Sequence, residues 1–196
     1  ASTKIEWTIL PQDATADRSP PLSLTVSDDG AQVLAGYDFA ENVLLWHRDK
    51  PEAPTTFPAE DGATGVAISA SGERIAYIDG DDVIVWKIGD LAPLRRFPTD
   101  EDMFRVALSD AGFIVAALEA DGEVYVWNVE TGATIVERRD GINPALGLAV
   151  DPRGTRIAIG RRNGEIDLIS SVDGSVLGTL SGQSALVYAL AFSPDG

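Results

Sequence analysis

The chain has 196 residues, of which 44% are hydrophobic, so it can bury a core of ordinary size. Its 31 acidic residues against 15 Lys and Arg give a net charge of -16, which repels phosphate backbones and anionic lipids, so neither nucleic acid nor a membrane is expected as a partner. The absence of cysteine excludes disulfides and thiolate metal ligands, and no apolar run reaches the roughly 18 residues of a membrane span.

Short apolar runs closed by Gly and Asp turns predict strands along the whole chain. Residues 1–10 contain one such run, and the polar loop from Pro11 to Pro21 follows it, because proline cannot serve a central strand. A first group of strands is predicted at 22–27, 32–37, 43–47 and near 55–57, and a second at 65–69, 74–78, 83–87 and 94–97. A third group has three runs between Met103 and Gly132 and a fourth strand at 134–138. The last group is predicted at 146–150, 156–159, 165–169 and 175–180, with one more strand at 186–193.

The groups repeat the same turn. Each first strand ends in a related motif, which reads LTVSDDG, VAISASG, VALSDAG, LAVDPRG and LAFSPDG and closes at Gly30, Gly72, Gly112, Gly154 and Gly196. The third strand of each group ends in an equivalent large apolar residue, which is Trp46, Trp86, Trp127 or Ile169. A period near 41 residues with four short strands per copy is typical of the blades of a β-propeller.

On these residues, the chain resembles the WD40-repeat family over residues 22–196, in a degenerate, bacterial-type form. The resemblance implies an all-β fold, a β-propeller of WD40 type with its four complete blades in one domain, each blade having strands a to d. The expected blades are residues 22–62, 63–102, 103–144 and 145–185. Residues 1–21 would hold strand d of a preceding blade and a proline-rich loop, and residues 186–196 strand a of a fifth blade.

Four complete blades with an orphan strand at each end do not close a ring. The orphan strands would be the outermost and the innermost strand of a blade, and these do not pair. We therefore expect an open arc, as part of a ring of about seven or eight blades. The alternative is that two copies self-associate through their open blade edges.

The polar network of the family is depleted in this sequence. In the family, His, Asp, a hydroxyl of strand b and the strand-c Trp form a hydrogen-bonded set, and an Asp follows the Trp. Here His47, Lys87 and Asn128 follow the three tryptophans, and the chain has no second histidine. Burial of Trp46, Trp86, Trp127 and Ile169 is therefore expected to hold the blades together in place of this network.

Catalysis is not expected from these residues. One histidine and no cysteine leave little for nucleophile–base pairs or metal clusters, and neither a Gly-x-Ser-x-Gly nor a phosphate-loop motif is present. The acidic run from Asp79 to Asp82 lacks the length and the terminal Glu of a calcium loop, so it predicts a solvated turn. We expect no catalytic residue, no cofactor and no metal ligand.

Sorting the charges by loop predicts one strongly acidic face. In the family, the d–a and b–c loops share a face of the ring, and here they carry many carboxylates against only Arg161 and Arg162. The proposed partner-binding residues among them are Glu60, Asp61, Asp79, Asp81, Asp82, Asp100, Glu101, Asp102, Glu119 and Asp121. A ring of carboxylates would attract a Lys- or Arg-rich segment. The competing interpretation is that the whole chain is acidic and its surface loops are simply polar.

These observations favour a non-catalytic protein–protein interaction scaffold or sensor module that binds a protein or a cationic peptide. The alternative is a fragment of a propeller hydrolase or lyase whose catalytic residues lie in missing blades. A purely structural array of blades is the third interpretation. No basic region followed by an apolar core begins the chain, which favours the cytoplasm, although the sequence does not start with Met.

Overall fold

The computed structural model describes residues 20–38, 40–99, 102–119, 122–138, 144–182 and 184–196. This part of the chain forms sixteen strands and no helix, so it contains no helix that could cross a membrane. The strand expected within residues 1–10 lies outside the described residues.

The strands form four sheets of four. The first sheet contains β1 (Ser23–Val26), β2 (Gln32–Gly36), β3 (Asn42–His47) and β4 (Lys50–Pro58). The second contains β5 (Ala63–Ile68), β6 (Arg74–Asp79), β7 (Asp82–Lys87) and β8 (Arg95–Pro98). The third contains β9 (Met103–Leu108), β10 (Ile114–Glu119), β11 (Val124–Asn128) and β12 (Thr134–Arg138). The fourth contains β13 (Ala145–Val150), β14 (Arg156–Arg161), β15 (Ile166–Ser170) and β16 (Val176–Leu180).

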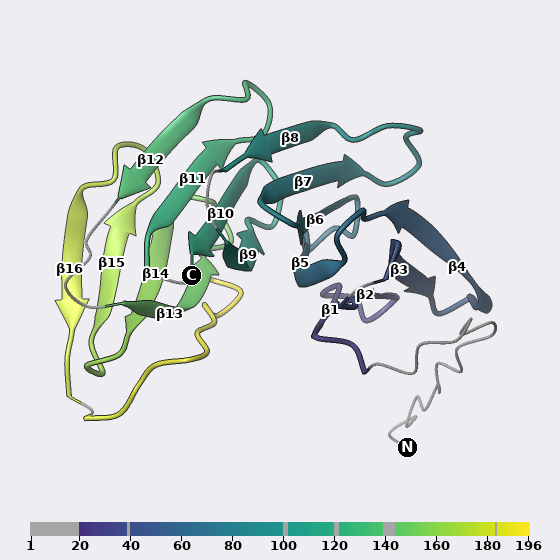
Figure 1. The fold of residues 1–196 in the computed structure, drawn as a ribbon. Helices are drawn as coiled ribbons and strands as arrows, with labels where there is room; N and C mark the ends of the chain where they lie inside the picture. The colour runs from purple at the N-terminus through teal and green to yellow at the C-terminus, as the bar shows by residue number, and fades with distance from the viewer. Residues whose placement is uncertain (1–19, 39, 100–101, 120–121, 139–143, 183) are drawn as a thin grey trace, which may run out of the picture.

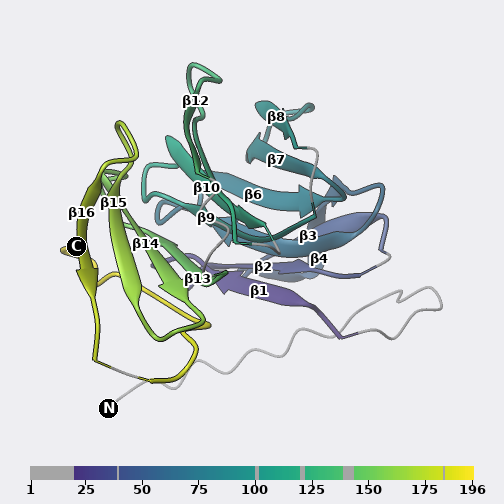
Figure 2. The same ribbon diagram turned by 60° about the vertical axis from the view of Figure 1, so that its left-hand side comes forward.

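Each sheet is an antiparallel meander, because every strand pairs with the next one along the chain. The four sheets follow one another around an arc, and β1 and β16 lie towards its two ends (Figure 1). Figure 2 shows the same succession from the side of the fourth sheet. The expected all-β fold with four complete four-stranded units is therefore confirmed.

Strand β4 is longer than its sequence predicts. It begins directly after a tight turn, with His47 opposite Lys50, and it continues through Pro51, Pro54 and Pro58. The prolines are tolerated because β4 is the last strand in its sheet, and its outer edge needs no ladder donors from them.

The turn between the first two strands is closed in the same way in all four sheets. The glycine of the turn has a φ between 64° and 69°, and its amide donates to the carbonyl three residues earlier, over 2.8 to 2.9 Å. The residue with that carbonyl is buried, and its side-chain oxygen accepts a second hydrogen bond, of 2.8 to 3.2 Å, from the amide five residues later. These four buried residues are Ser27, Ser69, Ser109 and Asp151.

Neighbouring sheets pack face to face, and one buried apolar cluster lies at each of the three junctions. A side chain from the last strand of one sheet meets the large apolar residue on the third strand of the next. The rings of Phe57 and Trp86 are 5.4 Å apart, and those of Phe97 and Trp127 are 5.0 Å apart. At the third junction, the matching pair in the cluster is Val136 and Ile169.

The segment 186–193, expected as a strand, forms no strand. It nevertheless contacts the fourth sheet at the same place at which the first residues of the second sheet contact the first sheet. Val187 donates to the carbonyl of Arg161 over 3.1 Å, as Ala63 donates to that of Tyr37 over 2.8 Å. The amide of Gly196 also closes the expected turn on Ser193. Contacts with the fourth sheet therefore place this segment. A strand would also need a partner strand to pair with, and the described residues contain none at this position.

Asp151 allows the repeated turn to be tested. We expect Asp151→Ala to lower the free energy of unfolding by about 2–4 kcal/mol, because it leaves the amides of Thr155 and Arg156 without their buried acceptor. Asp151→Ser should lose less, since serine closes the other three turns. The measurement is chemical denaturation of both variants beside the parent chain, and equal losses would contradict this role for the side-chain oxygen.

The same pair of variants gives a pH dependence. Burial opposes ionisation of Asp151, but hydrogen bonds from Arg156 and Thr155 outweigh it and hold the pKa of this carboxyl below its ordinary value of 3.8. Because the folded pKa is lowered, the ionised carboxylate stabilises the fold above pH 3.8, and this stabilisation is lost as the pH falls through the folded pKa. Denaturation over a pH series should therefore show the advantage of the parent over Asp151→Ser shrinking at acid pH.

Candidate binding face

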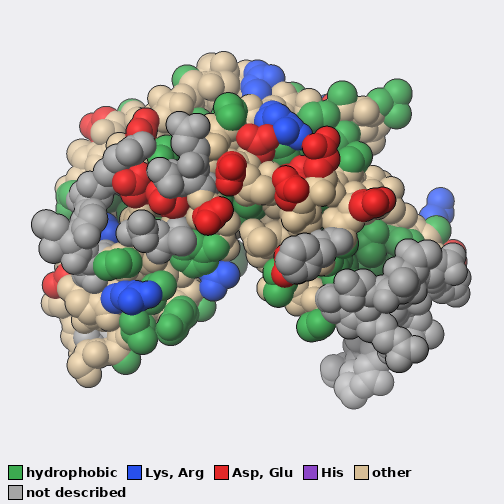
Figure 3. All heavy atoms as spheres, in the orientation of Figure 1, with side chains coloured by type: hydrophobic (Ala, Val, Ile, Leu, Met, Phe, Trp, Pro, Cys, Tyr) green, Lys and Arg blue, Asp and Glu red, His purple; other side chains and the backbone are tan. Residues whose placement is uncertain are grey.

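The acidic loops predicted from the sequence lie at one end of the sheets. Figure 3 shows acidic side chains gathered across the middle of the view, over the second and third sheets. Of the residues in these loops, Glu60, Asp61, Asp81 and Asp102 are exposed. Asp100, Glu101 and Asp121 lie outside the described residues.

Asp79 and Asp82 have structural partners within the second sheet. They face each other across the two-residue turn between β6 and β7. Asp79 is buried and accepts a hydrogen bond of 2.9 Å from the amide of Asp61, which ties this turn to the loop before β5. Arg96 of β8 reaches both carboxylates, at 2.5 Å from Asp82 and 4.0 Å from Asp79. These two carboxylates therefore help to shape the face, and their charge is partly neutralised by Arg96.

The last residue of the second strand occupies an equivalent place in three sheets. There Asp79, Glu119 and Arg161 are all buried at the edge of the candidate face. In the fourth sheet the charge is reversed, and Nε and Nη2 of Arg161 each lie 3.0 Å from Asp167. The other carboxylate oxygen of Asp167 accepts from Thr179 over 2.8 Å. The fourth sheet thus neutralises its buried charge internally, and the exposed Arg162 makes this sector less acidic.

A buried polar chain links the first two sheets at Trp86. The indole Nε1 of Trp86 donates to the hydroxyl of Tyr77 over 2.9 Å, and this hydroxyl donates to the carbonyl of Pro58 over 2.5 Å. Burial raises the pKa of Tyr77 to about 12, so the hydroxyl keeps its proton and can donate.

The expectation that burial alone replaces the polar network is therefore wrong for the second sheet. Tyr77 supplies the hydroxyl on the second strand that the sequence analysis did not identify. The strand register could have identified this hydroxyl. Ile75 pairs with Trp86, and Tyr77, two residues after Ile75, lies on the same face of the sheet as both. The predicted burial itself is found, since Trp46, Trp86, Trp127 and Ile169 are all buried.

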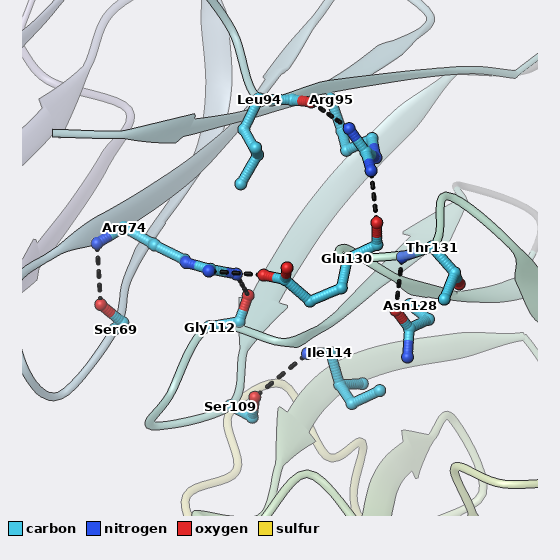
Figure 4. A network of polar contacts seen from close by, with 10 residues as sticks. All are labelled: Ser69, Arg74, Leu94, Arg95, Ser109, Gly112, Ile114, Asn128, Glu130 and Thr131. Atoms are coloured by element: carbon cyan, nitrogen blue, oxygen red, sulfur yellow. Dashed lines mark hydrogen bonds and ion pairs between the residues drawn. The ribbon is translucent and has the colours of Figure 1, made fainter. Parts of the chain in front are cut away.

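On the opposite face, which carries charges of both signs, an ion pair and hydrogen bonds from two arginines join the second sheet to the third. Figure 4 shows Arg74 of the second sheet reaching the third sheet, where it lies 2.5 Å from the carboxylate of Glu130 and donates to the carbonyl of Gly112 over 3.2 Å. Its guanidinium also lies 4.8 Å from the ring centre of Phe113. Arg95 donates to the carbonyl of Glu130. Both arginines are thus held by contacts between sheets.

The described residues contain no group of three or more His, Asp or Glu side chains that could hold a metal ion. The turn from Asp79 to Asp82 is instead a two-residue hairpin connection with an arginine beside it.

No protein-family model matches the chain. WD repeat-containing protein VIP3 of Arabidopsis thaliana is 26% identical over 179 residues, which cover 83% of this chain and 52% of VIP3. Meiotic recombination protein rec14 of Schizosaccharomyces pombe is 30% identical over 122 residues, which cover 59% of this chain and 39% of rec14. The crystal structure of the β-propeller domain of Cps50 (Swd1) from Myceliophteria thermophila has a TM-score of 0.79 at 12% identity, covering 92% of this chain and 60% of that one.

The repeated four-stranded sheets, the propeller neighbour and the WD-repeat relative agree. The described part of this chain is an arc of four β-propeller blades, and its sequence is similar to that of a WD repeat-containing protein. Its four sheets are propeller blades, and the chain spans about half, or less, of the length of the relatives it matches. Propellers of this type serve in general as scaffolds for protein interactions.

The polar chain at Trp86 predicts a measurable cost for losing one hydroxyl. Tyr77→Phe should lower the free energy of unfolding by about 1–3 kcal/mol, because the indole N–H and the Pro58 carbonyl lose their shared partner. Chemical denaturation measures this, and Tyr188→Phe, at an exposed tyrosine, is the matched control. Equal stability of the two variants would contradict the role assigned to the Tyr77 hydroxyl.

Proposed function

We propose that this WD40-type propeller is an interaction scaffold or sensor module whose acidic loop face binds a cationic peptide or protein segment. The observation that supports it is the set of exposed carboxylates of four residues on the loops before, within and after the second blade, which are Glu60, Asp61, Asp81 and Asp102. Among the described residues, none of these four carboxylates forms an ion pair, in contrast to Asp79 and Asp82 beside Arg96, so a basic ligand could pair with them.

The arrangement favours a ligand that lies across blades. Asp61 precedes the second blade and Asp102 precedes the third, while Asp81 lies in the hairpin between β6 and β7. An extended segment with several Lys or Arg could contact carboxylates from neighbouring blades at once. Exposed charges of this kind act mainly by speeding encounter and by adding modest affinity for each pair, and salt weakens both effects.

Two triple variants with the same change in net charge test the proposal. The first neutralises the proposed face, with Glu60→Gln, Asp81→Asn and Asp102→Asn. The second neutralises exposed acids of the opposite face, with Glu73→Gln, Asp28→Asn and Asp90→Asn. The probe is a fluorescent oligolysine peptide, and its dissociation constant is measured by anisotropy over a series of salt concentrations.

We expect the first triple variant to weaken binding at low salt by about tenfold and to flatten the salt dependence, whereas the second changes the affinity by less than about twofold. Equal weakening by the two variants would mean that overall charge, and not this face, attracts the peptide. Circular dichroism of both variants checks that the blades remain folded.

We also propose that the two ends of the arc self-associate. Leu22, Leu24 and Val26 are exposed near one end, and Val176 and Leu180 are exposed near the other. Light scattering should then give a mass that rises with protein concentration, and Leu24→Ser with Leu180→Ser should restore the monomer mass. A concentration-independent monomer in the parent chain would refute this proposal.

A further inference from the structure

The turn between β14 and β15 contains an asparagine followed directly by glycine. The sequence has four asparagines, and Asn163 is the one that precedes a glycine. Asn163 is exposed in this turn, and Gly164 has a φ of 89°. Because glycine has no side chain, nothing on residue 164 shields its backbone nitrogen from the preceding side chain.

The hydrogen bonds of the turn leave this nitrogen loosely held. The amide of Gly164 donates to the carbonyl of Arg161 over 3.3 Å, whereas the matching bond in the third blade, from Gly122 to Glu119, is 2.9 Å. The side-chain amide of Asn163 is turned towards the chain that follows it. Its Oδ1 accepts from the amide of Glu165 over 3.0 Å, and its Nδ2 donates to the Glu165 carboxylate over 2.5 Å.

We propose that Asn163 is a site of spontaneous deamidation. The backbone nitrogen of Gly164 loses its proton to hydroxide and attacks Cγ of Asn163, which forms a five-membered succinimide and expels Nδ2 as ammonia. Water then opens the ring at either carbonyl to give aspartate or isoaspartate. The overall change consumes one water and releases one ammonia, and no oxidant, reductant or cofactor takes part.

The modification converts an attraction into a repulsion. In place of the bond from Nδ2 to Glu165, two carboxylates face each other at the same position. The loop would gain a negative charge beside Arg162, in the blade where Arg161 and Arg162 interrupt the acidic face. On the proposed function, this gain extends the acidic face into the fourth blade and strengthens its attraction for a cationic segment.

The test of the site is the rate of conversion of the purified chain during incubation at mildly alkaline pH. Peptide mapping by mass spectrometry follows the gain of about 1 Da at each asparagine, and chromatography separates aspartate from isoaspartate. We expect Asn163 to convert at least about tenfold faster than Asn42 and Asn128, both of which precede valine, because glycine leaves the attacking nitrogen open. Conversion no faster than at Asn128 would overturn the proposal.

Two variants separate the chemistry from its consequence. Asn163→Gln should abolish the fast conversion, because a longer side chain disfavours ring closure, and persistent conversion of this peptide would refute the site. Asn163→Asp should bind oligolysine several-fold more tightly than the parent at low salt. Unchanged binding would refute the effect on the acidic face, whereas the conversion rate tests the modification whether or not the peptide binds.

Discussion

The arc depends on one repeated constraint, which is the buried oxygen that closes the first turn of each blade. Ser27, Ser69, Ser109 and Asp151 each accept a hydrogen bond from the first residue of the second strand. This bond fixes the register of the first hairpin, and a slip of one residue would turn every apolar side chain to the wrong face. The register in turn decides which side chains reach the neighbouring blade.

The turns also set the fit between blades. The turn glycine of each blade lies close to the preceding blade. A Cβ added to this glycine would come within 3 Å of the residue that lies two positions after the turn glycine of that preceding blade. The pairs are Gln32 with Gly72, Arg74 with Gly112, Ile114 with Gly154, and Arg156 with Gly196. The last of these pairs, together with the hydrogen bond from Val187 to the Arg161 carbonyl, lies where the terminal segment contacts the fourth blade. These contacts with the fourth blade position the segment, and the described residues form no ladder with it.

The charges of the two faces have different physical roles. On the mixed face, Arg74 and Arg95 join the second blade to the third through Glu130 and Gly112, so these cations stabilise the arc. On the acidic face, Asp79 and Asp82 shape a turn around Arg96, while the exposed carboxylates beside them point into solvent. The net charge of -16 means that the acidic groups repel one another, and a bound cationic ligand would reduce this repulsion. This contrast between the faces is the physical basis of the proposed binding function.

The sequence by itself determined the blades and most of their strands, because the turn motif and the tryptophan recur with a period near 41 residues and each apolar run has the period of a strand. It also determined which large residues are buried, since Trp46, Trp86, Trp127 and Ile169 stand at one register position. Only the tertiary structure decided how Tyr77 bonds Trp86 to the neighbouring blade and which acidic side chains of the candidate face are exposed. It also decided that the terminal segment forms no strand. These features depend on contacts between residues far apart in sequence, such as Arg96 with Asp79 or Tyr77 with Pro58, and local pattern carries no information about such contacts.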